Sequence, residues 1–235
     1  MINEMNYLTL ADKLVSKALK AGADAAEIYI SAGRNLSVNI LNGEIETIEE
    51  ADSAGAGIRV IAGGSLGFSY SNSLDIKSLE QTIEMAVKFA KLTTPDENNI
   101  LPALSGETDV DGLFDPETEG IPIDRKIAMA LELEKMAMSD SRITKSSGSF
   151  YGEEVTEIFI ASSGGSPRSY KASGCYLGVS VVAEKGDQKK TGGEYSSRRF
   201  FSDLPASGEI AAKAARKAYE MLDPRMVRTQ KAAVI

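Results

Sequence analysis

Residues 27–71, EIYISAGRNLSVNILNGEIETIEEADSAGAGIRVIAGGSLGFSYS, decide the fold, because apolar and polar residues alternate through most of this stretch. Alternation with a period of two is typical of a strand that has one buried face. Asn42-Gly43 separates two such runs and favours a tight type I′ turn, which needs positive φ at both central residues. Gly63-Gly64 meets the same demand without a Cβ atom. The stretch therefore predicts an antiparallel meander of five strands.

Helical periodicity on both sides of this stretch predicts two helices that cover one face of the sheet. Apolar residues recur every three or four positions over residues 9–20, where Thr9 can cap the helix and Gly22 can end it. A second helix follows Asp75, whose carboxylate can cap it, and ends before Pro95. Two helices on one side of an antiparallel sheet form an α+β layer.

The second half of the chain shows a similar mixture of helices and strands. A helix is predicted over residues 123–138, with Ile127, Leu131 and Met136 facing inward, and Ser207 is expected to cap a final helix. Alternating runs between these helices predict four strands, at residues 143–151, 155–161, 170–184 and 192–201. The predicted fold class is therefore α+β, with antiparallel sheets covered by helices in two subdomains.

An acidic segment at residues 95–122 separates the two halves. It contains four prolines and little periodicity, as expected of a linker. We expect an N-terminal α+β subdomain over residues 1–94, this linker, and a second α+β subdomain over residues 123–235. The chain stops on Ala-Ala-Val-Ile, where a strand would normally continue, so we also expect it to be truncated before a C-terminal domain.

The excess of acidic over basic residues lies entirely in that segment. The formal net charge is −8, and residues 95–120 contain eight acidic residues and no basic one. Removing these eight from the 34 acidic residues leaves 26, which equals the number of Lys and Arg. A nucleic-acid-binding protein should present an excess of basic residues on one face. We therefore expect no direct contact with nucleic acid.

The composition restricts the chemistry of the chain. It contains no histidine, which excludes HExxH zinc sites and the Ser-His-Asp and Cys-His nucleophile systems. Its single cysteine, Cys175, lies in an alternating run and is expected to be buried and structural. No Ser-x-x-Lys spacing occurs. We therefore predict no catalytic residue and no metal site in this chain. A carboxylate hydrolase would need two acids brought together by the fold, and no spacing favours it.

No segment of the sequence suggests a membrane or a secretory signal. No apolar run approaches the roughly 20 residues of a spanning helix. The N-terminus lacks both a basic region and an uninterrupted apolar region. We therefore expect a cytoplasmic protein.

Several short pieces of the sequence occur in a characteristic order. They are AEIY (26–29), NGEIE (42–46), GAGIRVI (55–61), GFS (67–69), PDEN (95–98), SSG (162–164) and residues 179–184, which precede the final helix. Together they resemble the TldD/PmbA family, also described as TldD/TldE proteins or modulators of DNA gyrase. The resemblance covers essentially the whole chain and is closest to the N-terminal half of such proteins, more PmbA/TldE-like at residues 95–98.

This resemblance implies a cytoplasmic peptidase that matures or degrades small unfolded peptides, with two subunits enclosing a cavity. The TldD-type subunit carries a histidine-containing motif for a divalent metal, expected to be zinc, and the PmbA/TldE-type subunit lacks it. No cofactor is therefore expected in this chain. The implied partners are a TldD-type subunit or a second copy in a dimer, an unfolded peptide, and DNA gyrase by the family name.

The residues leave two hypotheses for how the chain acts. An exposed sheet edge could hold an extended peptide by strand addition, with Arg59 as a contact for substrate or partner. The alternative for Arg59 is a solvated side chain or a pair with a nearby Glu. The alternative for the whole chain is a non-enzymatic module that binds a protein through its acidic linker or a sheet edge.

Overall fold

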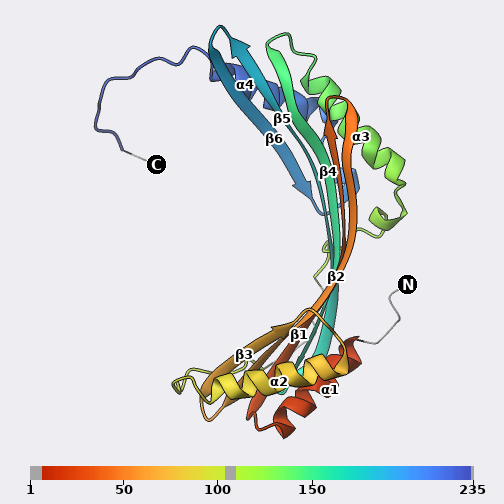
Figure 1. The fold of residues 1–235 in the computed structure, drawn as a ribbon, viewed down its shortest axis with the longest axis vertical. Helices are drawn as coiled ribbons and strands as arrows, with labels where there is room; N and C mark the ends of the chain where they lie inside the picture. Colours follow the sequence, from red (N-terminus) through yellow and green to blue (C-terminus); the bar gives the residue numbers. More distant parts are fainter. Residues whose placement is uncertain (1–6, 104–109, 234–235) are drawn as a thin grey trace. The chain divides into compact units, whose positions relative to one another are not determined.

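The computed structural model describes residues 7–103 and 110–233, which contain one six-stranded sheet and four α-helices (Figure 1). The strands lie in the order β3-β2-β1-β4-β5-β6, and β2 pairs with β3 and β5 pairs with β6 in antiparallel register. The predicted α+β class is therefore confirmed. The elements are α1 (Tyr7–Lys20), β1 (Ala25–Leu41), β2 (Glu44–Ala62), β3 (Ser65–Ser71), α2 (Ile76–Ala90), α3 (Ile123–Ala137), β4 (Ile143–Ser162), β5 (Gly165–Lys185), β6 (Gln188–Arg198) and α4 (Ser207–Glu220), with short 3₁₀ helices at Thr118–Gly120 and Phe201–Asp203.

The first meander has two long strands, β1 and β2, and one short strand, β3, so the prediction of five strands is wrong. Both predicted turns are present, because Asn42 and Gly43 have φ of 55° and 78°, and Gly63 and Gly64 have φ of 59° and 77°. Between these turns the strands continue through segments in which the alternation lapses. The glycines in these segments, such as Gly33 and Gly55, do not take positive φ, so the backbone stays extended and the ladder continues. For the same reason β4 is one strand and not two.

The described chain divides into two compact units that alternate along the sequence. Unit 1 consists of residues 1–35, 50–115 and 154–174, and unit 2 consists of residues 36–49, 116–153 and 175–235. Strands β1, β2, β4 and β5 each contribute residues to both units. The sequential division at residues 95–122 stays a prediction about domain organisation.

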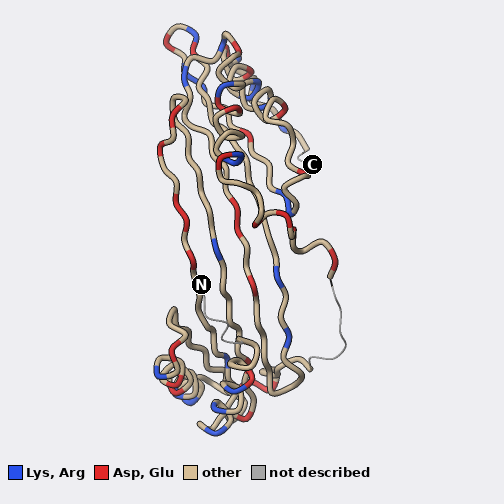
Figure 2. Tube along the Cα trace, turned by 90° about the vertical axis from the view of Figure 1, so that its right-hand side faces the viewer, with Lys and Arg blue, Asp and Glu red and all other residues tan. Residues whose placement is uncertain are grey.

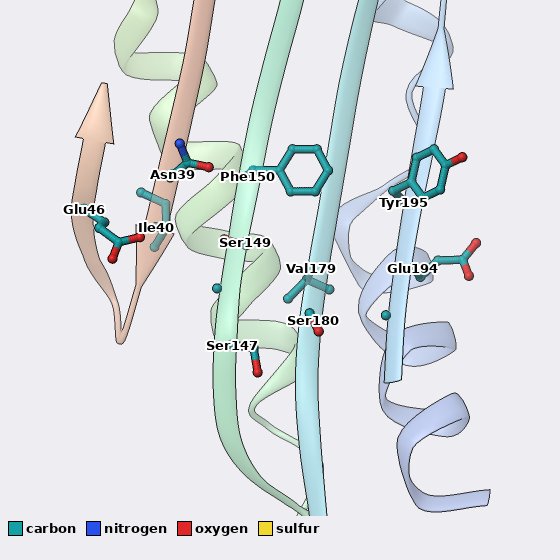
Figure 3. Close-up of a pocket in the computed structure, with 12 residues that line it drawn as sticks. Asn39, Ile40, Glu46, Ser147, Ser149, Phe150, Val179, Ser180, Glu194 and Tyr195 are labelled. Atoms are coloured by element: carbon teal, nitrogen blue, oxygen red, sulfur yellow. The ribbon is translucent and has the colours of Figure 1, made fainter. Parts of the chain in front are cut away.

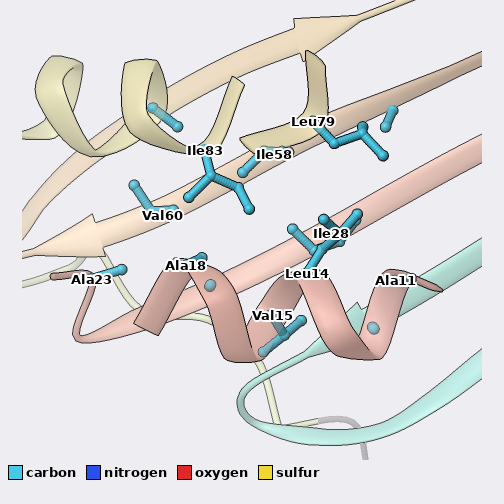
Figure 4. Close-up of a cluster of buried hydrophobic side chains, with 14 of the residues drawn as sticks. Ala11, Leu14, Val15, Ala18, Ala23, Ile28, Ile58, Val60, Leu79 and Ile83 are labelled. Carbon is cyan, nitrogen blue, oxygen red and sulfur yellow. The ribbon is translucent and has the colours of Figure 1, made fainter. Parts of the chain in front are cut away.

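In unit 1, helices α1 and α2 cover one face of the sheet. Leu14, Ile28, Ile58 and Leu79 are fully buried between the helices and the strands (Figure 4). Helix α2 approaches β3 closely at Gly67, where a Cβ atom would lie 2.0 Å from the carbonyl oxygen of Ala86. The predicted cap is confirmed, because Asp75 accepts a hydrogen bond from the backbone N–H of Ser78 at 2.9 Å.

In unit 2, helices α3 and α4 cover one face of the sheet. Their core includes Val38, Leu133, Leu177 and Val181, which are fully buried. Helix α4 approaches β6 closely at Gly192, where a Cβ atom would lie 2.2 Å from the backbone nitrogen of Ala218 and 2.4 Å from the carbonyl oxygen of Ala214. Each unit therefore has a glycine on its edge strand that lets a helix pack directly on the backbone.

Two sequence predictions for these helices need correction. The inward face of α3 carries Lys126, Ala130, Leu133, Glu134 and Ala137, whereas Met136 is exposed and Ile127 and Leu131 are half-buried. Charged residues take inward positions here because partners inside unit 2 satisfy them. Ser207 was expected to cap α4, but the N-cap is Ala206, and the Ser207 hydroxyl lies 3.4 Å from Glu132 Oε2.

The described residues of the acidic segment up to Asp115 belong to unit 1, and those from Pro116 belong to unit 2. The N–H of Asp96 donates to the carbonyl of Gly64 at 3.0 Å. Near the other end, the N–H of Ser173 on β5 donates to the carbonyl of Leu113, and the N–H of Asp115 donates to the Ser173 hydroxyl at 2.8 Å. Asp115 is buried. Glu107 and Asp109 lie outside the described residues.

Candidate functional site

Arg59 lies on β2 in register with Phe68 of β3. Its Nη2 atom lies 2.8 Å from Oε1 of Glu27, so it has the Glu partner that the alternative interpretation expected. The Arg59 side chain is 39% exposed, and its Nε is buried without a hydrogen-bond partner in the part of the chain that the structure describes. A contact between Arg59 and a substrate or partner stays a prediction.

Arg59 shares with three aromatic residues the face of unit 1 that α1 and α2 leave uncovered. Tyr29 follows Glu27 on this face by alternation along β1, and Phe68 and Tyr70 extend from β3. Tyr29 is hydrogen-bonded to Tyr170. Burial and the neighbouring Tyr170 raise the pKa of Tyr29.

Unit 2 has a pocket of about 340 Å³ on the face of the sheet opposite α3 and α4, which we call the open face (Figure 3). Five strands supply its lining, and Figure 3 shows the helices behind them. The volume lies at the lower end of the range for small-molecule and side-chain sites. The lining residues are Asn39, Ile40, Glu46, Ser147, Gly148, Ser149, Phe150, Val179, Ser180, Gly193, Glu194 and Tyr195.

Two aromatic side chains form one wall of this pocket. Phe150 projects to the open face, because its neighbours Ser149 and Tyr151 are buried on the helical side. Tyr195 is 68% exposed and is paired with Gly178 in the β5–β6 register. A Cβ atom at Gly178 would lie 2.6 Å from Phe150 Cε1 and 2.8 Å from Tyr195 Cβ. The absence of a side chain at Gly178 therefore leaves room for both aromatic groups.

The charged groups of the pocket are both carboxylates. Glu194 is paired with Lys217 of α4. Glu46 has no ion pair or hydrogen bond among residues 7–103 and 110–233, and no Lys or Arg lines the pocket there. Small residues, Ser180 and Gly193, lie in register across β5 and β6 beside these groups. The pocket therefore combines aromatic rings, hydroxyl groups and an unpaired negative charge.

A buried polar cluster lies on the helical side of the same unit. Lys126 Nζ lies 2.6 Å from Glu153 Oε1, and the Tyr151 hydroxyl donates to Glu153 Oε2 at 2.7 Å. The Lys126 and Glu153 side chains are 5% and 13% exposed, and Tyr151 is fully buried. Because this cluster is enclosed and internally paired, we assign it a structural role.

The described residues do not fit a metal site of the kind that the resemblance implies. The chain has no histidine, and Cys175 is buried with its Sγ 3.5 Å from the carbonyl oxygen of Arg198. Within the described ranges, no three Asp, Glu or Cys side chains come together as metal ligands. Zinc would need such a set.

The charges on the helices of each unit are of mixed sign (Figure 2).

Sequence reasoning missed the open-face pocket. Its residues come from strands that are far apart in sequence and are brought together by the sheet order. Alternation marks Phe150 and Tyr195 only as exposed strand residues, which are common.

No helix in the described residues combines the length and apolar content needed to cross a bilayer.

Two models of one protein family match the chain. The model of the PmbA/TldA metallopeptidase domain 1 matches residues 26–90, and the model of the PmbA/TldA metallopeptidase central domain matches residues 116–222. The matched residues make up most of the chain.

Curated relatives have the same family name. A Haemophilus influenzae protein named "Metalloprotease PmbA homolog" is 29% identical over 94% of this chain and 49% of its own length. The "Metalloprotease PmbA" of Escherichia coli O157:H7 is 27% identical over 96% of this chain and 51% of its own length. The chain therefore spans about half the length of the curated relatives that it matches.

Solved structures share the fold. A Bacteroides thetaiotaomicron protein described as a candidate modulator of DNA gyrase superposes with a TM-score of 0.86 at 24% identity, over 97% of this chain and 52% of its own. TldE from Thermococcus kodakarensis superposes with a TM-score of 0.75 at 22% identity, over 88% of this chain and 46% of its own.

Proposed function

The chain belongs to the PmbA/TldD metallopeptidase family, and we propose that it is the N-terminal, non-catalytic region of a PmbA/TldE-like subunit. In this proposal it acts in the cytoplasm and holds small unfolded peptides, which a TldD-type subunit cleaves or matures at its own divalent metal, expected to be zinc. A TldD-type partner or a second copy of the chain completes the complex. The PmbA names of the relatives support the PmbA/TldE-like assignment.

The observation that carries the peptide-holding role is the open edge of unit 2. Strand β6 pairs with β5 over 11 residues on each strand, and no other described strand pairs with its outer side. An edge strand presents unpaired backbone N–H and C=O groups, and an extended peptide can pair with them whatever its side chains are. This property suits a protein that receives unfolded peptides of varied sequence.

An assay of peptide cleavage by the chain, with and without a TldD-type subunit, tests whether the partner supplies the catalytic site. We expect no cleavage by the chain alone, and cleavage that a chelator abolishes when the partner is present. Cleavage by the isolated chain that survives the chelator would contradict the proposal.

Backbone recognition is tested with a labelled unfolded peptide and the same peptide N-methylated at alternate residues. Because N-methylation removes the donors of a β ladder, we expect binding to weaken about tenfold or more. Equal binding of the two peptides would argue against strand addition. An Arg59→Gln variant measured in the same assay tests whether Arg59 contacts the peptide.

A second candidate function is a non-enzymatic module that binds a protein, because a structural neighbour is described as a candidate modulator of DNA gyrase. The acidic segment would then engage a basic surface. A pull-down with the eight acidic residues of 95–120 neutralised tests this version. Capture of gyrase that does not depend on these charges would exclude the acidic segment as the binding surface.

A further inference from the structure

The open-face pocket of unit 2 has the chemistry of a site for a cationic side chain. We propose that it binds the side chain of a Lys or Arg residue in an extended peptide. This inference rests on the proposed function, because the ligand is a residue of the peptide that the chain would hold. It adds a preference for basic residues that backbone pairing on β6 cannot provide.

The first argument comes from the two aromatic groups. Phe150 on β4 and Tyr195 on β6 lie on either side of β5 (Figure 3), and both side chains come close to the Cβ position of Gly178 on β5. The negative face of an aromatic ring attracts a cation that lies within about 6 Å of its centre. Tyr195 is largely exposed, so a side chain arriving from solvent can reach its ring.

The second argument comes from the charge of the lining. Glu46 lacks a cationic partner within the described ranges, whereas Glu194 is neutralised by Lys217. The nearest ion pair on the open-face side of β5 and β6, Glu184 with Lys189 at 3.0 Å, is satisfied within itself. Glu46 lies on β2, on the other side of the pocket from the aromatic groups, and its unpaired negative charge in the lining favours a cation and disfavours an anionic ligand.

The third argument comes from the position of the pocket. Tyr195 and Glu194 belong to β6, the edge strand whose outer backbone is unpaired. A peptide added to β6 would place alternate side chains on the open face. A long, flexible Lys or Arg side chain could then lie along the sheet toward the pocket with its charged end near the aromatic rings.

Four labelled unfolded peptides that differ at one central residue, Lys, Arg, norleucine or Glu, test this inference by fluorescence anisotropy on the full chain. We expect the Lys and Arg peptides to bind about twofold to fivefold more tightly than the norleucine peptide, as cation–π attraction predicts. The Glu peptide should bind most weakly.

Variants of the pocket then show where the preference resides. Tyr195→Ala and Glu46→Gln should each reduce the preference for Lys over norleucine about twofold to fivefold, whereas Tyr195→Phe, which keeps the ring, should retain most of it. The matched controls are Tyr70→Ala, which removes a similarly exposed Tyr from the edge strand of unit 1, and Glu44→Gln, which changes a neighbouring acid outside the pocket. Urea unfolding verifies that each variant is folded.

The outcomes separate this inference from the proposed function. Equal binding of all four peptides would overturn the side-chain preference and leave peptide holding intact. Failure of all four peptides to bind would overturn both. A preference for Lys that is equally lost in Tyr70→Ala would overturn the assignment to this pocket. Dissociation of a dimer by Tyr195→Ala, with no change in peptide binding, would assign the pocket to a second copy of the chain.

Discussion

The carboxylate of Glu134 accepts a hydrogen bond from the backbone N–H of Gly43, with 2.6 Å between Oε2 and the nitrogen. Its other oxygen accepts the N–H of Asn42 at 3.1 Å and the hydroxyl of Ser146. Helix α3 therefore holds the turn between β1 and β2 through one buried side chain. Three donors satisfy this carboxylate, which explains why an acid occupies the inward face of the helix.

Replacing Glu134 should destabilise unit 2. The variant Glu134→Ala removes the carboxylate that accepts hydrogen bonds from two turn amides and a hydroxyl, and a hydrogen bond to a charged group contributes about 1.5–3 kcal/mol. We expect a loss of about 2–4 kcal/mol in the free energy of unfolding, measured by urea denaturation. Lys135→Ala, which removes an exposed charge from the next position of the same helix, should cost about 0.5 kcal/mol or less. Equal losses in both variants would contradict this role of Glu134.

Two adjacent glycines on β6 should respond differently to the same substitution. Gly192→Ala places a methyl group 2.2 Å from the backbone nitrogen of Ala218, so α4 must move away from the sheet. We expect a loss of about 2 kcal/mol or more in the free energy of unfolding. At Gly193 the nearest atom to a new Cβ is 3.5 Å away, so Gly193→Ala should be tolerated. The thermal midpoints of the two variants should differ clearly, and coincident midpoints would contradict the close packing of α4.

The buried pair of Lys126 and Glu153 should show strong coupling in a double-mutant cycle. Lys126→Met leaves the Glu153 carboxylate buried with the Tyr151 hydroxyl as its remaining partner among the described residues, and breaking such a pair costs about 3–5 kcal/mol. The double variant Lys126→Met/Glu153→Gln removes both charges and should recover much of that loss. Additive effects of the two single changes on urea unfolding would show that the charges do not interact.

The cap of α2 should make stability depend on pH in the acid range. Hydrogen bonds from Ser73 and Ser78 lower the pKa of Asp75 to about 2 in the folded protein. A lowered pKa stabilises the fold above the unfolded pKa of about 4, and this contribution is lost as the pH falls from about 4 to 2. Asp75→Asn should therefore differ most from the unchanged protein above pH 4, by urea midpoint. A difference that stays constant down to pH 2 would argue against an ionised cap.

The local features of the fold could be predicted from the sequence. The hairpin turns at Asn42-Gly43 and Gly63-Gly64 and the cap at Asp75 depend on the chemistry of a few adjacent residues, and all three are confirmed. The strand count failed, because a lapse in alternation around Gly33 and Asn35 resembled a loop, although neither residue takes positive φ and the backbone stays extended there.

The non-local features could not be predicted. Lys126 and Glu134 are charged residues on the buried face of α3, and their partners lie on β4 and in the turn after β1. The open-face pocket needs β1, β2, β4, β5 and β6 side by side, an order that periodicity does not reveal. Arg59 could be chosen as a candidate contact, but its pair with Glu27 depends on the register of β1 and β2.

The alternation of the two units along the chain has a consequence for synthesis on the ribosome. Unit 1 needs residues 154–174, and unit 2 needs residues 36–49, so the chain passes between the units five times. Domains commonly fold one after another as the N-terminal part emerges. Here the last residues of unit 1 emerge only after half of unit 2 has been made. We therefore expect the nascent chain to remain incomplete as a folding unit until Gly174 has left the ribosome, and an early stop in translation to release strands that lack their neighbours.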